Sequence, residues 1–342
     1  MKKWFWWGGL LAIATTTTIF FYSYTNNFLG NWYSSLLASQ LTVNNTPEIV
    51  QKPILKRKLK TPETITAPKV NTHQLIAHIK ALNFERYEDI SRSQTREYII
   101  NNLKKSGWSP TLQTFDFGVN VVAEKPGSNP EAGTILLAAH YDTVIGSPGA
   151  DDNASGVATV LEVARLLSKF PTARTLKIAF FDLEEKGLLG SSAFANQTEN
   201  LSNLQGAIVL DMVGFACHTP GCQQYPPGLP ITPPSDKGDF LAVIGDAESP
   251  QLLAAFNNKN SPNLPPVITL PVPFKGVATP DLLRSDHAPF WLRGIGAVLI
   301  TDTANFRSPH YHKPTDKPDT IDQEFFTGVA QIVANATATL LN

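Results

Sequence analysis

The feature that most constrains this 342-residue chain is a series of short apolar segments that alternate with stretches of helical periodicity. A short apolar run bounded by turns is consistent with a buried strand, whereas apolar residues at i, i+3 and i+4 predict a helix. Strands are expected at 119–123, 134–139, 176–181, 207–210, 241–244 and 296–300. Helices are expected at 73–108, 156–167, 251–256 and 325–341. This alternation predicts an α/β fold, a three-layer sandwich with helices on both faces of a largely parallel, mixed central sheet.

The composition and charge limit the kinds of partner. With 42% hydrophobic and 17% charged residues, the chain can bury a substantial core. A net charge of −1 and the lack of a basic stripe with interleaved aromatic residues exclude a nucleic-acid partner. Two long proline-rich segments, 215–238 and 261–286, are expected to be irregular loops that shape a functional site. The sequence gives no indication of the oligomeric state.

The amino terminus has the pattern of an export segment. Residues 4–21 contain no charge and follow two lysines, and this length is just sufficient to span a membrane. Lysines on the amino side favour a cytoplasmic amino terminus. We therefore expect a membrane anchor at 1–24, a flexible Pro/Thr/Lys-rich linker at 25–70 and a folded domain at 71–342 on the extracytoplasmic side. A cleaved signal peptide, which would release a secreted protein, is the alternative.

Only two cysteines are present, Cys217 and Cys222, separated by four residues. A disulfide between them is the favoured interpretation for an exported protein. Two free thiols, or a metal site completed by the neighbouring His218, are the alternatives.

Histidine and acidic side chains come directly after the expected strands. His140 and Asp142 follow the strand at 134–139, and alternate residues of an extended chain share a face. Asp142 can therefore orient a histidine that binds metal. Asp151 and Asp152 open the next helix, where such residues either cap the helix or bridge two cations.

The same pattern recurs further along the chain. Glu184 and Glu185 follow the strand at 176–181, where one can bind a metal while the other holds a water molecule. Three more candidates follow later strands: Asp211, His310 and His312. We expect one of the two histidines to be a ligand. This set of nitrogen and oxygen donors suits zinc, whereas no GxSxG motif supports a serine nucleophile.

The order of these motifs resembles a known family. His-x-Asp, Gly-Ala-Asp-Asp-Asn-Ala-Ser-Gly, Glu-Glu-x-Gly-Leu-x-Gly-Ser, Leu-Asp-Met and Tyr-His-x-x-x-Asp, spread over about residues 135–322, resemble the co-catalytic zinc aminopeptidases of metallopeptidase family 28. The resemblance implies two Zn²⁺ ions and these five ligands: His140, Asp152, Glu185, Asp211 and His312. It places His140 and Asp211 on one ion, Glu185 and His312 on the other, and Asp152 between them.

The resemblance also implies roles for the neighbouring residues. Glu184 would be the general base, Asp142 would brace His140, and Asp151 would bind neither ion. The Asp152–Asn153 peptide is expected to be cis. The turn at 285–287 would be either a wall of the site or part of the packing, and no tyrosine can be matched to an oxyanion donor.

The implied function is hydrolysis of the amino-terminal residue from peptides with a free amino terminus. A carboxypeptidase or amide hydrolase on the same scaffold, and a one-zinc glutaminyl cyclase, are the alternatives within this fold. A non-catalytic ectodomain is the alternative from another class, and it is disfavoured because every implied ligand position and the base are filled.

Overall fold

One mixed sheet organises the part of the chain that the computed structural model describes, namely residues 65–226, 235–257, 263–277 and 279–342. Its eight strands are β1 (Thr111–Phe115), β2 (Gly118–Lys125), β3 (Thr134–His140), β4 (Thr175–Phe181), β5 (Leu204–Leu210), β6 (Leu241–Asp246), β7 (Val267–Val272) and β8 (Ala297–Thr301). They lie in the order β1-β2-β4-β3-β5-β8-β6-β7. The central strands β4, β3, β5 and β8 are parallel to one another. On either side of this group, β2 runs antiparallel to β4 and β6 runs antiparallel to β8.

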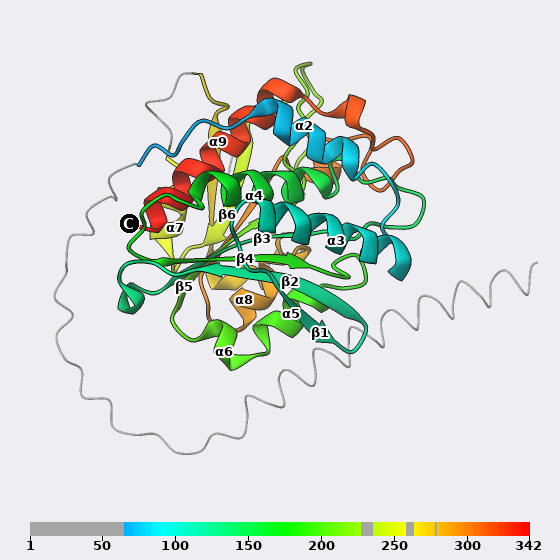
Figure 1. Cartoon of the computed structure of the whole chain (residues 1–342). Coiled ribbons are helices and arrows are strands. Elements are labelled where there is room, and N and C mark those ends of the chain that lie inside the picture. The colour runs from blue at the N-terminus through cyan, green and yellow to red at the C-terminus, as the bar shows by residue number, and fades with distance from the viewer. Residues whose placement is uncertain (1–64, 227–234, 258–262, 278) are drawn as a thin grey trace, which may run out of the picture. The chain divides into compact units, whose positions relative to one another are not determined.

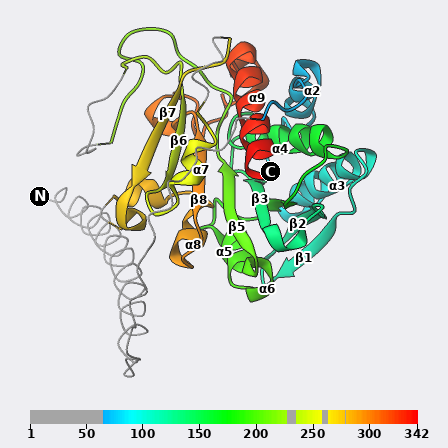
Figure 2. The ribbon, with the colours of Figure 1, turned by 90° about the vertical axis from the view of Figure 1, so that its left-hand side faces the viewer.

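Helices cover both faces of this sheet (Figure 1). One face carries α2 (Thr72–Ala81), α3 (Asp89–Lys105), α4 (Ala154–Leu167), α7 (Pro250–Ala254) and α9 (Gln323–Leu340). The other face carries α5 (Leu189–Ala195) and α8 (Ala288–Leu292), with α6 (Thr198–Leu201) next to them (Figure 2). Short 3-10 helices lie at 130–132, 273–276, 280–283, 304–306 and 318–320. The predicted three-layer α/β sandwich is confirmed.

Alternating side chains of the central strands build the two halves of the core. In β3, Ile135 and Leu137 pack under α4 and α9, whereas Leu136 and Ala138 face α5 and α8. Both sets are almost fully buried, so these strands read as continuous apolar runs. Burying one such leucine or isoleucine contributes about 1.5–3 kcal/mol. The core thus fixes the strands whose ends carry the candidate residues.

The helix predicted at 73–108 is wrong as a single element. The structure has two helices, α2 and α3, separated by an irregular stretch at 82–88. Arg86 lies within this stretch, and its buried guanidinium donates hydrogen bonds to five main-chain carbonyls. The chain must leave the helical path to place this side chain inside the protein.

The prediction of a wholly irregular segment at 261–286 is also wrong. The edge strand β7 and two short 3-10 helices lie within it. Pro271 sits inside β7 and hid the strand pattern, yet proline is tolerated in edge strands because one side of the strand has no partner to receive a hydrogen bond.

The disulfide between Cys217 and Cys222 is present, which rules out the free-thiol and metal-site alternatives. Residues 65–70 run along α9, where the Ile65 amide donates to the Thr339 hydroxyl and the Val70 amide donates to the Gln331 side chain. Packing against the domain therefore begins before residue 71.

Within the described ranges, no helix is both long and apolar enough to cross a bilayer. The predicted anchor at 1–24, and the linker up to residue 64, lie outside those ranges.

Candidate metal centre

Three neighbouring parallel strands deliver the first candidate residues to one edge of the sheet. His140 is the last residue of β3, and Asp211 directly follows β5. Glu184 and Glu185 come just after β4. Because β4, β3 and β5 are parallel, their carboxyl ends meet at this edge.

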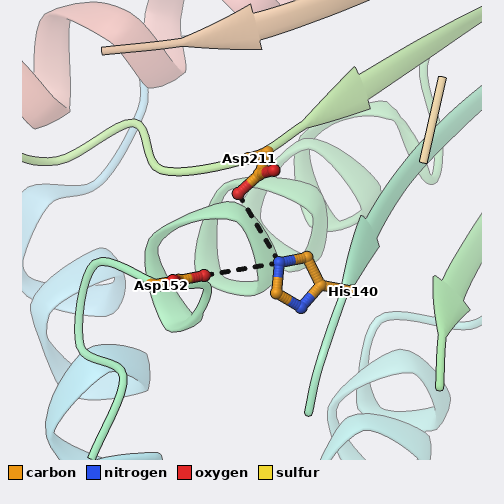
Figure 3. A group of neighbouring side chains, drawn as sticks. All are labelled: His140, Asp152 and Asp211. Atoms are coloured by element: carbon orange, nitrogen blue, oxygen red, sulfur yellow. Dashed lines mark ion pairs between the residues drawn. The ribbon is translucent and has the colours of Figure 1, made fainter. Parts of the chain in front are cut away.

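A first group of ligand atoms surrounds one ring nitrogen of His140 (Figure 3). His140 Nε2 lies 3.5 Å from Asp152 Oδ1 and 3.5 Å from Asp211 Oδ1. Asp152 comes from the amino-terminal approach to α4, so the group joins three elements. All three ligand atoms lie within 4.8 Å of one another.

A second group uses the other oxygen of the same aspartate. His312 Nε2 lies 3.2 Å from Asp152 Oδ2 and 3.1 Å from Glu185 Oε2. Asp152 therefore belongs to both groups, with one carboxylate oxygen in each. All five residues expected to bind metal converge in this way.

The spacing and the donor types fit two zinc ions. Ligand atoms about 2.1 Å from a tetrahedral zinc lie about 3.4 Å apart, close to the 3.1–3.5 Å found here. Glu185 Oε1 is buried and has no hydrogen-bond partner. A buried carboxylate oxygen without a hydrogen-bond partner is costly unless a cation binds it.

Asp142 connects the histidine to the turn after β4. Its Oδ1 lies 3.4 Å from His140 Nδ1 and accepts the main-chain hydrogen of Glu184 at 3.0 Å. Its Oδ2 accepts the main-chain hydrogen of Glu185 at 3.2 Å. Asp142 is in position both to orient His140 and to hold the two glutamates.

The pKa values of the two glutamates shift in the opposite direction to that of the shared Asp152. Burial raises the pKa of Glu184 well above its usual value. Burial and the Asp152 charge raise the pKa of Glu185 to about 7. Burial alone would raise the pKa of Asp152, but hydrogen bonds from His140 and His312 lower it. Glu184 belongs to neither ligand group, and it lines the adjacent cavity, so it is free to handle a proton.

The segment at 149–153 is held from two sides. Asp316 accepts hydrogen bonds from the main chain of Asp151 at 2.9 Å and of Asp152 at 3.0 Å. On the other side, Arg86 donates to the Gly149 carbonyl at 2.8 Å. Gly149 has a positive φ of 59°, and a Cβ there would collide with the Asp152 carbonyl, so glycine is required. The Asp152–Asn153 peptide is cis, as expected.

The remaining candidates stay outside both groups. The Asp151 carboxylate turns away and accepts the Gly214 amide at 2.8 Å. His310 Nδ1 lies 3.0 Å from the Thr315 hydroxyl oxygen and joins neither group. At the 285–287 turn, Ser285 lines the cavity, and His287 Nε2 lies 2.8 Å from the Leu282 carbonyl oxygen.

A cavity of about 420 Å³ opens beside the metal centre. Glu184 and the shared Asp152 lie on its wall. Its other walls are largely apolar and include these strand residues: Ala242, Ile244, Ile268, Leu270 and Leu299. The sheet face near β6 and β7 thus forms an apolar chamber next to the candidate ligands.

Sequence reasoning missed three residues of this region. Arg86 carries no local motif, and its role depends on carbonyls up to 63 positions away. Asp316 was visible only as part of the spacing after His312. Tyr311 belongs to the Tyr-His-x-x-x-Asp motif, but the motif gave it no role; it stacks on the His312 ring with centroids 3.7 Å apart and lines the cavity.

Comparison with known proteins agrees with this geometry. A model of the family described as Peptidase family M28 matches residues 120–337. The YfbL protein of Escherichia coli is 33% identical over 286 residues, which cover 75% of this chain and 82% of YfbL. Aminopeptidase YwaD of Bacillus subtilis is 39% identical over 225 residues, which cover 62% of this chain and 42% of YwaD. This chain therefore spans less than half the length of YwaD.

Solved structures share the fold. The LapA aminopeptidase of Legionella pneumophila aligns over 80% of this chain and 72% of its own, with a TM-score of 0.63 and 19% sequence identity. At this identity the likeness concerns the fold alone.

Proposed function

Because this chain belongs to peptidase family M28, we propose that it is a zinc-dependent aminopeptidase that removes amino-terminal residues from peptides. The observation that carries the proposal is the convergence of five ligand residues on a shared aspartate, Asp152, beside an apolar cavity. Similarity to aminopeptidases, YwaD among them, supports the reaction class.

The proposed centre holds two zinc ions. His140, Asp211 and one oxygen of Asp152 would hold the first. Glu185, His312 and the other oxygen of Asp152 would hold the second. Zinc bound there supplies a Lewis acid that polarises a peptide carbonyl and makes water more acidic.

The protein itself supplies proton transfer and orientation. Glu184 takes a proton from the attacking water and returns it to the leaving amine nitrogen, a role that typically contributes 10²–10⁴-fold. Asp142 fixes the main chain of Glu184 and the ring of His140. The apolar cavity receives the side chain of the substrate's amino-terminal residue, and a large apolar residue suits its walls.

The decisive experiment separates metal binding from proton transfer. Glu184→Gln should retain both zinc ions but lose at least about a hundredfold in kcat, because the amide cannot accept the proton. Asp152→Ala should lose zinc as well as activity, because it removes a ligand from each group. Zinc content by mass spectrometry and hydrolysis of aminoacyl amides give the two readouts. Full activity of Glu184→Gln would disprove its role.

The same assays distinguish the alternatives. Cleavage of amino-blocked peptides from their carboxyl ends would indicate a carboxypeptidase. One zinc per chain, together with pyroglutamate formed from an amino-terminal glutamine, would indicate a glutaminyl cyclase. A folded chain without zinc and without turnover would indicate a non-catalytic ectodomain.

We also propose that the catalytic domain lies outside the cytoplasm, tethered by residues 1–24. The Cys217–Cys222 disulfide supports this because such bonds persist in oxidising compartments. Alkaline carbonate washing should leave the chain in the membrane fraction. A soluble chain trimmed near residue 24 would show that the segment is instead a cleaved signal peptide. An untrimmed chain in the cytosol with reduced thiols would contradict export.

A further inference from the structure

One wall of the cavity is an irregular segment, Gln223–Pro226, directly after the disulfide. Among the described residues, two main-chain hydrogen bonds hold it, from Gln223 to the Asp236 carbonyl and from Gln224 to the Phe306 carbonyl. Neither belongs to a ladder of strand pairs, so side-chain contacts must contribute to the position of this wall.

Arg307 makes those contacts from behind the wall. It is 5% exposed and does not line the cavity. Its Nε donates to Gln223 Oε1 at 2.8 Å, and its Nη2 donates to the Phe240 carbonyl at 2.8 Å. Its Nη1 donates to the Phe215 carbonyl at 3.3 Å. One guanidinium thus joins the irregular wall to the chain entering β6 and to the segment before the disulfide.

The Gln223 side chain connects Arg307 to the lining of the cavity. It is 4% exposed and belongs to the lining. Its amide nitrogen donates to the Thr303 hydroxyl at 2.9 Å and to the Gln224 carbonyl at 2.7 Å. Thr303 lines the cavity too, so Gln223 ties together two parts of the lining while Arg307 fixes its oxygen.

The residues around Arg307 fit an arginine side chain. The Arg307 guanidinium lies over the Phe240 ring, 4.7 Å from the centroid. Gly238 leaves room for the side chain, because a Cβ there would lie 2.5–2.7 Å from Arg307 Nε, Cδ and Cγ. A lysine has a single ammonium group and cannot reproduce the planar fork that reaches three acceptors in different directions.

We propose that Arg307 is a positioning residue that sets the shape of the apolar cavity, and so determines how strongly the enzyme prefers a large apolar amino-terminal residue. The proposal rests on the proposed aminopeptidase function. Arg307 belongs to neither ligand group and does not line the cavity, so its effect reaches the substrate through the lining residues that it contacts, Gln223 and Phe240.

The test compares Arg307→Lys with Arg293→Lys, the same change at an exposed arginine away from the cavity. Hydrolysis of leucine and alanine p-nitroanilides is measured together with zinc content. In Arg307→Lys, kcat/KM for the leucine substrate should fall about tenfold, mainly through KM, and the alanine substrate should change less than about threefold. Differences of this size are typical when a hydrophobic pocket loses its fit. Zinc content should not change.

A second variant guards against misfolding of Arg307→Lys. Gly238→Ala keeps the arginine but places a methyl group against its side chain, which must then shift. Like Arg307→Lys, it should lower the ratio of kcat/KM for the leucine substrate to kcat/KM for the alanine substrate. A ratio equal to that of the wild type in both variants would overturn the proposal. An equal fall for both substrates would assign Arg307 a merely structural role.

Hydrogen exchange separates failure of this inference from failure of the proposed function. The amides of residues 223–225 should exchange faster in Arg307→Lys and Gly238→Ala than in Arg293→Lys. Unchanged exchange would overturn the positioning role even if the protein cleaves no aminoacyl amide. Faster exchange in Arg307→Lys and Gly238→Ala, together with a wild type that has no peptidase activity, would preserve the role of Arg307 in the wall and reject the aminopeptidase.

Discussion

His310 and His312 are two residues apart on the same loop, yet only His312 reaches the candidate metal centre. The His312 backbone has a positive φ of 57°, which is uncommon for a residue with a side chain. Its Nε2 lies between carboxylate oxygens of Asp152 and Glu185. His310 instead pairs with Thr315 and packs edge-on against the Phe215 ring.

This difference predicts distinct outcomes for two matched substitutions. His312→Ala should lose one of the two proposed zinc ions and at least about a hundredfold in kcat/KM, because it removes a proposed ligand. His310→Ala should keep both ions and most of the activity. Metal analysis of the two purified variants is the measurement. Loss of zinc from His310→Ala alone would reverse the choice between them.

At the residue scale, the sequence predicted the five side chains that form the two ligand groups among the described residues. The five residues follow strands or open a helix, and their order matches the family pattern. Of the supporting residues, Asp142 was predicted, whereas Arg86 and Arg307 were not. Arg86 and Arg307 act through hydrogen bonds to main-chain carbonyls, and such contacts leave no periodic or spaced signal in the chain.

At the level of elements, the segment that leads into α4 and contains Asp152 is held in position by other parts of the chain. Asp316 comes from the loop before α9, yet its two oxygens hold the amides of Asp151 and Asp152. Asn153 caps α4 by accepting the Gly156 amide at 3.0 Å, and it donates to the Leu210 carbonyl at the end of β5 at 2.8 Å. The shared Asp152 is thus positioned by contacts from the loop before α9 and from the end of β5.

Asp316→Asn tests this support. An asparagine keeps one acceptor oxygen but replaces the other with an NH₂ group, which cannot accept the Asp152 amide. Zinc affinity should fall about 10–100-fold, the range typical for residues that orient metal ligands. Competition with a zinc chelator measures the affinity. Asp319→Asn, an exposed aspartate on the same loop, is the control and should bind zinc like the wild type.

The element predictions failed where tertiary contacts override local pattern. The periodicity at 73–108 is helical on both sides of residues 82–88, so nothing local shows the break that admits Arg86 to the interior. The strands β1 and β7 lie at the two edges of the sheet, and their side chains are only partly buried. Edge strands carry a weaker apolar pattern than central ones.

For the whole molecule, one buried histidine far from the metal centre links stability to pH. His78 of α2 is 9% exposed, and burial lowers its pKa to about 4 despite the opposing charge of Glu162. The unfolded chain, with an ordinary histidine pKa of 6.5, therefore binds a proton more readily than the folded protein. The resulting stabilisation is present above pH 6.5 and is lost as the pH falls from 6.5 towards 4.

His78→Gln should remove this dependence. As the pH falls from 6.5 to 4, the wild type should lose up to about 3 kcal/mol more unfolding free energy than the variant. One pKa unit corresponds to about 1.4 kcal/mol. Urea unfolding at a series of pH values measures the difference. The control is His73→Gln, which replaces an exposed histidine on the same helix. Its unfolding free energy should depend on pH as that of the wild type does. Parallel pH curves for His78→Gln and the wild type would refute this role.

The sequence by itself determined the α/β class, the central strands and the side chains that meet at their carboxyl ends. It did so because buried parallel strands are short apolar runs, and whatever follows them must emerge at one edge of the sheet. The tertiary structure alone decided what holds those side chains in place and how the neighbouring cavity is shaped. Arg307 and Gln223 are 84 positions apart, and Arg86 and Gly149 are 63 apart. Contacts of this kind arise only when the packed core brings distant irregular segments together, and no local pattern encodes them.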